Sequence, residues 1–268
     1  MSRIITLLSD FGLQDGYVGA MKGVILGINP QALLIDISHE IEAHDVTAGA
    51  FVLASTYSYF PHGTIHVAVV DPGVGSGRRA MIVETKRGYF VGPDNGIFTL
   101  IYERETVIRA VSAENPKFVE PNPSRTFHGR DIFAPTAAYL SLGVSVEDFG
   151  PPVDSGQVLA FPSPRISDGM LEGQVIHVDR FGNLITNISV GVFEEFVGAG
   201  NQEIRLANHK VSGPYESYDE GRKGEVFGIF GSSDLLEISM KEKGARETLG
   251  LDRGTVVRVL RPVKGGGR

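Results

Sequence analysis

Cysteine is absent from the 268 residues of this sequence. The chain can therefore form no disulfide framework, no thiolate metal site and no cysteine nucleophile. No uninterrupted apolar run reaches the roughly 18 residues that a membrane-spanning helix requires. The first ten residues hold one basic side chain and an apolar run too short for the core of a signal peptide. These absences predict a cytoplasmic protein with no membrane partner.

Clustered positive charge is also missing. Lysine and arginine number 25 against 32 aspartate and glutamate residues, which gives a net charge of -7. Phosphate backbones are bound by clustered lysine and arginine, so nucleic acid is not expected as a partner. The length allows a substantial core and suits two domains.

Residues 1–150 alternate between strand-like and helix-like patterns. Short β-rich runs occur at residues 4–8 and 65–70, among others, and apolar residues recur at helical spacing from Tyr17 and after Asp45, a predicted N-cap. Alternating strands and helices predict an α/β domain with a largely parallel central sheet.

A segment rich in proline and glycine follows at residues 151–168 and is predicted to be a linker. Beyond it the helical period fades. Short β-prone runs separated by glycine and asparagine turns predict a smaller β-barrel or sandwich domain over residues 169–264.

A glycine-rich loop follows the predicted strand at residues 65–70. Asp71 directly follows that strand, and the loop then supplies three glycines followed by Arg78 and Arg79. Glycine permits close approach of a ligand to the backbone, and arginine is charged at any relevant pH. The pattern indicates a ligand-binding turn; the alternative is an aspartate that caps an ordinary turn. No helix follows the loop, so its glycines do not indicate a dinucleotide-binding motif.

Asp10 follows the first predicted strand as Asp71 follows the third. Ligands of such sheets bind beyond the carboxyl ends of the strands, so both carboxylates are expected at one rim. An aspartate at this position often accepts hydrogen bonds from a ribose diol. The alternative for residues 9–12 is a simple turn.

His128 stands at the start of a predicted helix over residues 131–142. The dipole of that helix disfavours a protonated imidazole, which predicts a neutral hydrogen-bonding partner near pH 7. Asp131 is expected to be the N-cap. A purely structural role for His128 is the alternative.

Two further patterns bear on function. Asp179, Phe181 and Asn183 form a turn between predicted strands and together suit an ammonium group and a flat base; an ordinary hairpin is the alternative. Scattered acidic and imidazole side chains raise a metallohydrolase as a possibility, but none has a recognised ligand spacing, so no metal site is predicted. These are Asp36, His39, His44, Asp45 and His66.

Five segments in this order resemble the S-adenosyl-L-methionine (SAM) hydroxide adenosyltransferases, which are adenosine-forming SAM hydrolases related to the SAM-dependent fluorinase and chlorinase. The resemblance implies an N-terminal α/β domain, a C-terminal β-barrel and a homotrimer with SAM at the subunit interfaces. It is carried by LLSDFG at 7–12, VVDPGVG at 69–75, VGPDNG at 91–96, FHGRD at 127–131 and DRFGN at 179–183.

The resemblance also implies roles for individual residues. An Asp–Arg–His set around the attacking water maps onto Asp71, Arg78 and His128. Asp10 would hold the ribose hydroxyls, with Phe11 beside it at the substrate. The other implied contacts are Asp179 with the methionine ammonium, Phe181 and Asn183 with the nucleoside, Ser232 and Ser233 with the methionine carboxylate, and the Ala245 backbone with the adenine edge. No cofactor is implied, because SAM is the substrate.

Two positions separate this sequence from the fluorinase. Asp71 stands where the fluorinase carries a tyrosine, and Gly129 stands where it carries the halide-binding serine. The inserted loop typical of the fluorinase is also missing between residues 38 and 60. These differences favour water over halide as the nucleophile and predict adenosine and L-methionine as products. The alternatives are a SAM-dependent halogenase and a SAM- or adenosine-binding regulatory protein with incidental turnover.

Overall fold

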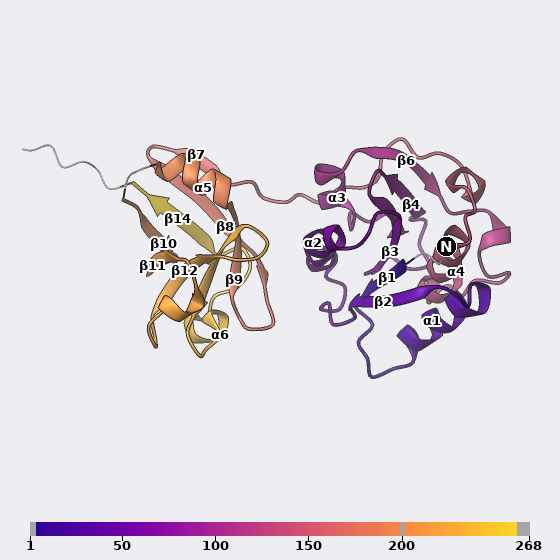
Figure 1. Cartoon of the computed structure of the whole chain (residues 1–268), viewed down its shortest axis with the longest axis horizontal. Coiled ribbons are helices and arrows are strands. Elements are labelled where there is room, and N and C mark those ends of the chain that lie inside the picture. The colour runs from indigo at the N-terminus through magenta and orange to yellow at the C-terminus, as the bar shows by residue number, and fades with distance from the viewer. Residues whose placement is uncertain (1–3, 199–200, 262–268) are drawn as a thin grey trace, which may run out of the picture. The chain divides into compact units, whose positions relative to one another are not determined.

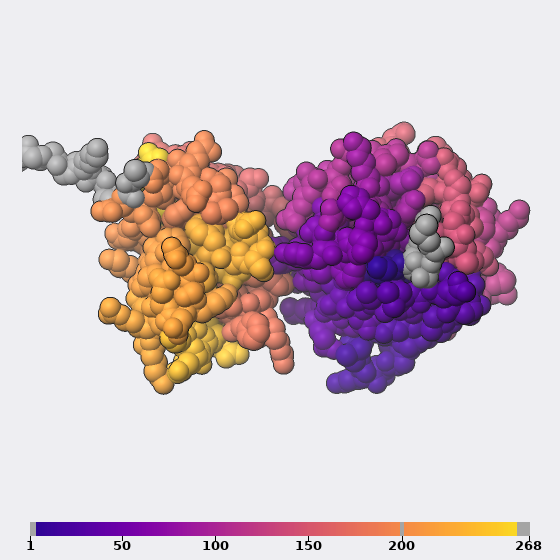
Figure 2. Space-filling view, viewed as in Figure 1, coloured from indigo at the N-terminus to yellow at the C-terminus, as the bar shows by residue number. Residues whose placement is uncertain are grey.

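The computed structural model describes residues 4–198 and 201–261. It divides into two compact units, Met1–Leu159 and Ala160–Arg268, so the division falls within the segment predicted as a linker. Each unit has its own hydrophobic core. Figure 1 labels their helices and strands, and Figure 2 shows their surfaces, with the first unit in indigo to pink and the second in orange to yellow. Within the described ranges, no helix has the length and apolar character needed to cross a membrane.

The first unit is built on a six-stranded sheet with the order β2-β1-β3-β5-β4-β6. Five strands run in one direction and only β4 is antiparallel to its neighbours, which confirms the prediction of a largely parallel sheet. The strands are β1 (Ile4–Ser9), β2 (Leu33–Ser38), β3 (Thr64–Val69), β4 (Ala80–Thr85), β5 (Gly88–Pro93) and β6 (Val107–Ser112).

Helices cover both faces of this sheet (Figure 1). The apolar side chains of α1 (Tyr17–Ile28) and α4 (Ala134–Ser141) share one core with the β1 residues Ile5 and Leu7. On the other side lie α2 (Val46–Thr56) and α3 (Thr99–Arg104). As predicted, Asp45 caps α2, because its carboxylate accepts a hydrogen bond from the backbone of Ala48.

The helix predicted over residues 131–142 differs in its first turn. A π-helical turn at Gly129–Phe133 precedes α4, and His128 occupies the position before that turn. The prediction that Asp131 is the N-cap is therefore wrong. Its carboxylate instead accepts a hydrogen bond of 2.7 Å from the backbone of Ser124 and pairs with Arg130.

The proline-rich segment is partly ordered against the first unit. Val153 donates a backbone hydrogen bond to the carbonyl of Ala110, and the backbone of Gln157 donates to the carboxylate of Asp94. Strand β7 (Arg165–Ser167) belongs to the second unit, where it pairs with β8.

The second unit is a closed β-barrel. Its strands follow the order β8-β9-β13-β12-β11-β10-β14, and β14 pairs with β8 to complete the circle. Closure leaves no unpaired edge among these strands and resolves the predicted choice between barrel and sandwich in favour of the barrel. Residues 262–264 of the predicted domain lie outside the described residues. The elements are β8 (Met170–Val178), β9 (Leu184–Ser189), α5 (Val190–Val197), β10 (Glu203–Leu206), β11 (His209–Tyr215), β12 (Val226–Phe230), β13 (Leu235–Met240), α6 (Ala245–Leu249) and β14 (Val256–Leu260).

Candidate active site

A pocket of about 270 Å³ opens at the carboxyl ends of β1 and β3. Ser9 of β1 pairs in register with Val69 of β3, so the chain leaves both strands at the same edge of the sheet. Asp10 and Asp71 both line this pocket, as the strand order predicts. The remaining lining residues are Phe11, Tyr17, Ala43, His44, Val69, Val74, Thr126, Phe127, His128 and Gly129.

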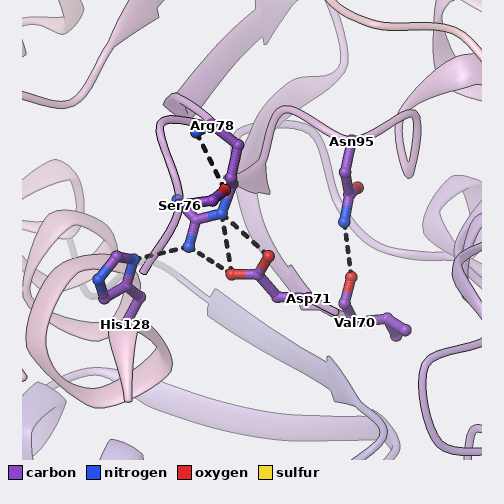
Figure 3. A network of polar contacts seen from close by, with 6 residues as sticks. All are labelled: Val70, Asp71, Ser76, Arg78, Asn95 and His128. Carbon is purple, nitrogen blue, oxygen red and sulfur yellow. Dashed lines mark hydrogen bonds and ion pairs between the residues drawn. The ribbon is translucent and has the colours of Figure 1, made fainter. Parts of the chain in front are cut away.

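Arg78 connects Asp71 to His128, two of the residues that line the pocket (Figure 3). Its Nε donates hydrogen bonds of 2.9 and 3.0 Å to the two carboxylate oxygens of Asp71, and its Nη2 also bonds Oδ2. The same Nη2 donates to Nδ1 of His128 at 2.7 Å. Both members of the ion pair are nearly buried, with side chains 7% and 5% exposed, so water screens their attraction only weakly.

The contact with Arg78 fixes the protonation of His128. A guanidinium has only donors, so Nδ1 must accept and the single imidazole proton must sit on Nε2. Burial, and after it the positive charge of Arg78, lowers the pKa of His128. The predicted direction is therefore right, but its causes are burial and a neighbouring cation rather than the helix dipole.

One glycine lets the loop of residues 71–79 reach His128. Gly75 has a φ of 76°, and a Cβ at this position would lie 2.3 Å from the carbonyl oxygen of Arg125. The loop thus passes in close contact with the segment that leads into His128. A side chain at Gly75 would force the two apart, and Arg78 would move with the loop.

Arg79 points to a different partner. It pairs with Asp94 through Nε at 2.9 Å and Nη2 at 2.6 Å, and Nη2 also donates to the carbonyl of Ser155. The two adjacent arginines therefore separate, one toward the pocket and one toward the segment that leaves the first unit.

Asp10 is held by an unusual turn. Its Oδ2 accepts a hydrogen bond of 2.9 Å from the backbone of His44, whose φ is 69°. Left-handed backbone is uncommon for residues other than glycine and often occurs at functional sites. Because His44 also lines the pocket, the turn places a backbone donor on Asp10 at the pocket.

Aromatic side chains form one wall of the pocket. Phe11 contacts Tyr17 and Phe127 with ring centroids 5.8 Å apart in each case, and Tyr17 lies 5.1 Å from Phe127. Sequence reasoning named only Phe11. It assigned Tyr17 to a helix and gave Phe127 no role, since neither has a local signal that separates a pocket wall from a core.

The other predicted substrate-binding residues lie in the second unit. Asp179 closes its own hairpin, because it accepts hydrogen bonds from the backbones of Phe181 and Asn183 and from the Asn183 side chain, at 2.8–2.9 Å. The ring of Phe181 is 79% exposed at the turn. The hairpin thus presents an aromatic face on a rigid support.

Ala245 lies beside this hairpin. The backbone of Arg246 donates to the carbonyl of Gly182, and a Cβ on Gly182 would lie 2.8 Å from Gly244. Ala245 is fully buried in this structure. Ser232 and Ser233 lie in the turn between β12 and β13, and the buried Oγ of Ser233 has no hydrogen-bond partner among the described residues.

Comparisons with known proteins identify the family of this chain. The SAM hydroxide adenosyltransferase N-terminal domain matches residues 5–150, and the C-terminal domain of the same family matches residues 173–258. This chain belongs to the SAM hydroxide adenosyltransferase family. The match confirms the resemblance drawn from the five sequence segments.

Individual relatives of this family member cover between three quarters and nearly all of its length. It is 37% identical to the (R)-S-adenosyl-L-methionine hydrolase of Thermus thermophilus, over 96% of this chain and 100% of that protein. The crystal structure of a conserved protein from Thermotoga maritima has a TM-score of 0.88 at 35% identity and covers 97% of this chain and 100% of that one. A fluorinase of an Actinoplanes species is 29% identical, over 76% of this chain and 77% of that protein.

Gly129 has little room for a side chain in this family member. A Cβ there would lie 3.1 and 3.2 Å from the ring of Phe11 and 3.2 Å from the sulfur of Met21. Most Cβ contacts are looser than this, so a serine would require the neighbours to shift. The pocket is shaped around a glycine at this point.

A metal centre finds no support in the described part of the chain. Within residues 4–198 and 201–261, no group of three or more histidine, aspartate or glutamate side chains is placed to hold an ion. Two of the histidines considered for a metallohydrolase make other contacts: Nδ1 of His39 lies by the Ser9 hydroxyl, and Nδ1 of His66 lies by the Thr6 hydroxyl.

Proposed function

We propose that this chain hydrolyses SAM to adenosine and L-methionine. The observation that carries the proposal is the Asp71–Arg78–His128 network at the edge of the pocket, in a chain of the SAM hydroxide adenosyltransferase family. The (R)-S-adenosyl-L-methionine hydrolase of Thermus thermophilus supports the same substrate and reaction.

The reaction places its demand on the nucleophile. The oxygen of water forms a bond to C5′ of SAM, the C5′–S bond breaks, and its electron pair stays on sulfur. The sulfonium thereby becomes the neutral thioether of methionine, and one water proton is released. Because the leaving group needs neither an acid nor a Lewis acid, the protein has to bind, orient and deprotonate water.

The three residues divide this work. The Nε2–H of His128 donates to the water oxygen and leaves one of its lone pairs directed at C5′. Arg78 supplies a fixed positive charge that favours hydroxide over water. Asp71 is the candidate proton acceptor, since Oδ1 accepts one hydrogen bond from Arg78 and has a second lone pair available. Holding water and C5′ at reacting distance accounts for about 7–11 kcal/mol of barrier reduction.

Substrate binding uses both units in this proposal. Asp10 and Phe11 contact the ribose side of SAM in the pocket. Asp179, Phe181, Asn183, Ser232, Ser233 and the Ala245 backbone contribute from the second unit of a neighbouring subunit in a homotrimer. Light scattering of the purified protein tests the trimer directly.

We further propose that no cofactor or metal takes part and that the protein acts in the cytoplasm. The first follows from the chemistry of a neutral leaving group. EDTA treatment should leave turnover unchanged, and loss of activity restored by a divalent ion would contradict it.

Incubation of the protein with SAM, followed by chromatography, tests the reaction. Adenosine and L-methionine should accumulate in equal amounts. Tight binding of SAM without turnover would instead support a regulatory protein. A halide series tests the halogenase alternative: chloride or fluoride should yield no 5′-halo-adenosine, because Gly129 and its crowded surroundings offer no serine hydroxyl.

A further inference from the structure

Strand β1 carries two buried pairs in which a hydroxyl meets an imidazole. Thr6 Oγ1 lies 2.8 Å from Nδ1 of His66, and Ser9 Oγ lies 2.7 Å from Nδ1 of His39. Both hydroxyl residues are fully buried. The pairs differ in their surroundings, because His66 lies among the rings of the core, whereas His39 belongs to a longer polar chain.

This series of polar contacts runs outward from Ser9. Nε2 of His39 lies 3.1 Å from Oδ1 of Asp36, and Oδ2 of Asp36 accepts a hydrogen bond of 2.6 Å from Lys22 on α1. Burial favours the neutral acid of Asp36, but the contacts with Lys22 and His39 outweigh it and lower the pKa of Asp36. The Asp36 carboxylate therefore lies beside the His39 imidazole, but Nε2 of His39 makes no hydrogen bond within the described residues, so this link is a charge contact.

At its inner end, this series of polar contacts holds the turn that carries Asp10 and Phe11. Ser9 Oγ accepts a hydrogen bond of 3.3 Å from the backbone of Phe11. The carbonyl of His39 accepts one of 2.8 Å from the backbone of Gly12, whose φ is 64°. His39 therefore contacts the turn at both ends, because its imidazole bonds the Ser9 hydroxyl and its carbonyl bonds the backbone of Gly12. Asp10 lies between these two anchors.

The order Ser–His–Asp is that of a hydrolase triad, but nucleophilic chemistry is excluded by burial. Ser9 is 0% exposed and His39 is 4% exposed, so no substrate carbonyl can reach the hydroxyl. This series of polar contacts can instead fix the position of the turn that carries Asp10 and Phe11. Ser9 provides the hydrogen-bonded link between His39 and the turn, and Asp36 contacts the imidazole on its outer side.

We propose that Lys22, Asp36, His39 and Ser9 form a positioning relay that orients Asp10 and Phe11 for the ribose of the substrate. The inference rests on the proposed function for the identity of that substrate. Ser9, His39 and Asp36 are positioning residues, since they act through Asp10 and Phe11.

Two variants and a matched control test the relay. Ser9→Ala removes the inner hydroxyl, and Asp36→Asn changes the outer, partly exposed link. Thr6→Val removes the equivalent hydroxyl from the other pair on the same strand. The measurements are KM and kcat for SAM and the Kd values of adenosine and of 2′,3′-dideoxyadenosine, which lacks both ribose hydroxyls.

Ser9→Ala should raise KM for SAM about threefold to tenfold, the range expected for one lost hydrogen bond, with a much smaller change in kcat. Asp36→Asn removes the charge beside His39 and should raise KM in the same direction. Both should also reduce the preference for adenosine over the dideoxy analogue, whereas Thr6→Val should keep that preference. If Ser9→Ala fails to fold, Asp36→Asn still decides the matter.

An unchanged preference for adenosine in either folded relay variant would overturn the relay, as would an equal loss of preference in Thr6→Val. Failure of the proposed function has a different signature. A wild-type protein that binds adenosine but leaves SAM intact would reject the hydrolase, while the binding comparison would still test the relay.

Discussion

Nη2 of Arg78 lies 2.7 Å from Nδ1 of His128, although the two residues are 50 positions apart in the sequence. This contact makes His128 an acceptor on one side and a donor on the other. It also keeps the imidazole from acting as the base as long as Arg78 stays in place. In the proposed reaction, the Asp71 carboxylate is therefore the candidate acceptor for the proton of the attacking water.

Replacing Arg78 by lysine should keep the charge but lose the paired contacts to Asp71 and His128. We expect kcat for SAM to fall about 100-fold, the effect of removing one preorganised donor, with KM little changed. Lysine is chosen over alanine because an unpaired buried Asp71 would cost roughly 3–5 kcal/mol of stability. Arg79→Lys is the matched control, since Arg79 pairs with Asp94 outside the pocket, and its kcat should stay within about twofold. Equal losses in the two variants would contradict the role of Arg78.

The pH dependence of turnover should follow the lowered pKa of His128. Its folded pKa lies below the usual 6.5, so the neutral form that accepts from Arg78 persists at and below pH 6.5. As pH falls through the folded pKa, protonation removes the acceptor and kcat/KM should decline. The acid limb of a kcat/KM profile should thus have its midpoint below 6.5. His128→Asn keeps an acceptor oxygen without a titrating ring, and it should lose that limb; an unchanged limb would assign it to another group.

Gly75→Ala should damage both stability and turnover. The positive φ disfavours any side chain, and the added Cβ would meet the carbonyl of Arg125 at 2.3 Å. We expect a lower Tm and a kcat reduced at least about tenfold, because the loop carries Arg78 and small misplacements of reacting groups are costly. Gly77→Ala is the control, since it lies next to Arg78 and its Cβ would meet nothing within 4 Å. Equal behaviour of the two variants would reject the close approach as the reason for Gly75.

Stability should depend on pH through His66. Burial lowers its pKa from 6.5 to about 3 in the folded protein. Below pH 6.5 the unfolded chain binds a proton that the folded chain does not, so folding stability falls as pH decreases toward 3. The slope for one group is about 1.4 kcal/mol per pH unit, which amounts to about 2 kcal/mol between pH 6.5 and 5.

Urea unfolding of the wild type and of a Thr6→Val/His66→Phe double variant measures this difference. The double variant removes the titrating ring and the hydroxyl that pairs with it. Its free energy of unfolding should fall about 2 kcal/mol less than that of the wild type between pH 6.5 and 5. Parallel pH dependence in the two proteins would show that His66 does not carry the effect.

Local patterns in the sequence predicted the parallel sheet, a second domain that is a β-barrel or sandwich, and the position of Asp10 and Asp71 at one rim. Their success has a simple reason: strand periodicity and the turn residues that follow a strand are set within a few neighbours, and parallel strands bring their carboxyl ends to one edge. The same local reasoning gave the wrong N-cap for the helix after His128. Asp131 is of a residue type that often caps helices, but the helical segment begins before it. Asp131 therefore lies in the first turn, where its carboxylate contacts Ser124 and Arg130.

The sequence by itself determined which side chains this protein has for its chemistry and the strands from which they come. Only the tertiary structure decided that Arg78 turns toward His128 while Arg79 turns toward Asp94. It also decided that His44, Tyr17 and Phe127 complete the pocket. Finally, it brought Ser9, His39 and Asp36 into one series of contacts. These contacts join residues that lie on different elements. Their strength comes from burial and from the direction of each donor, and neither quantity exists until the elements pack together.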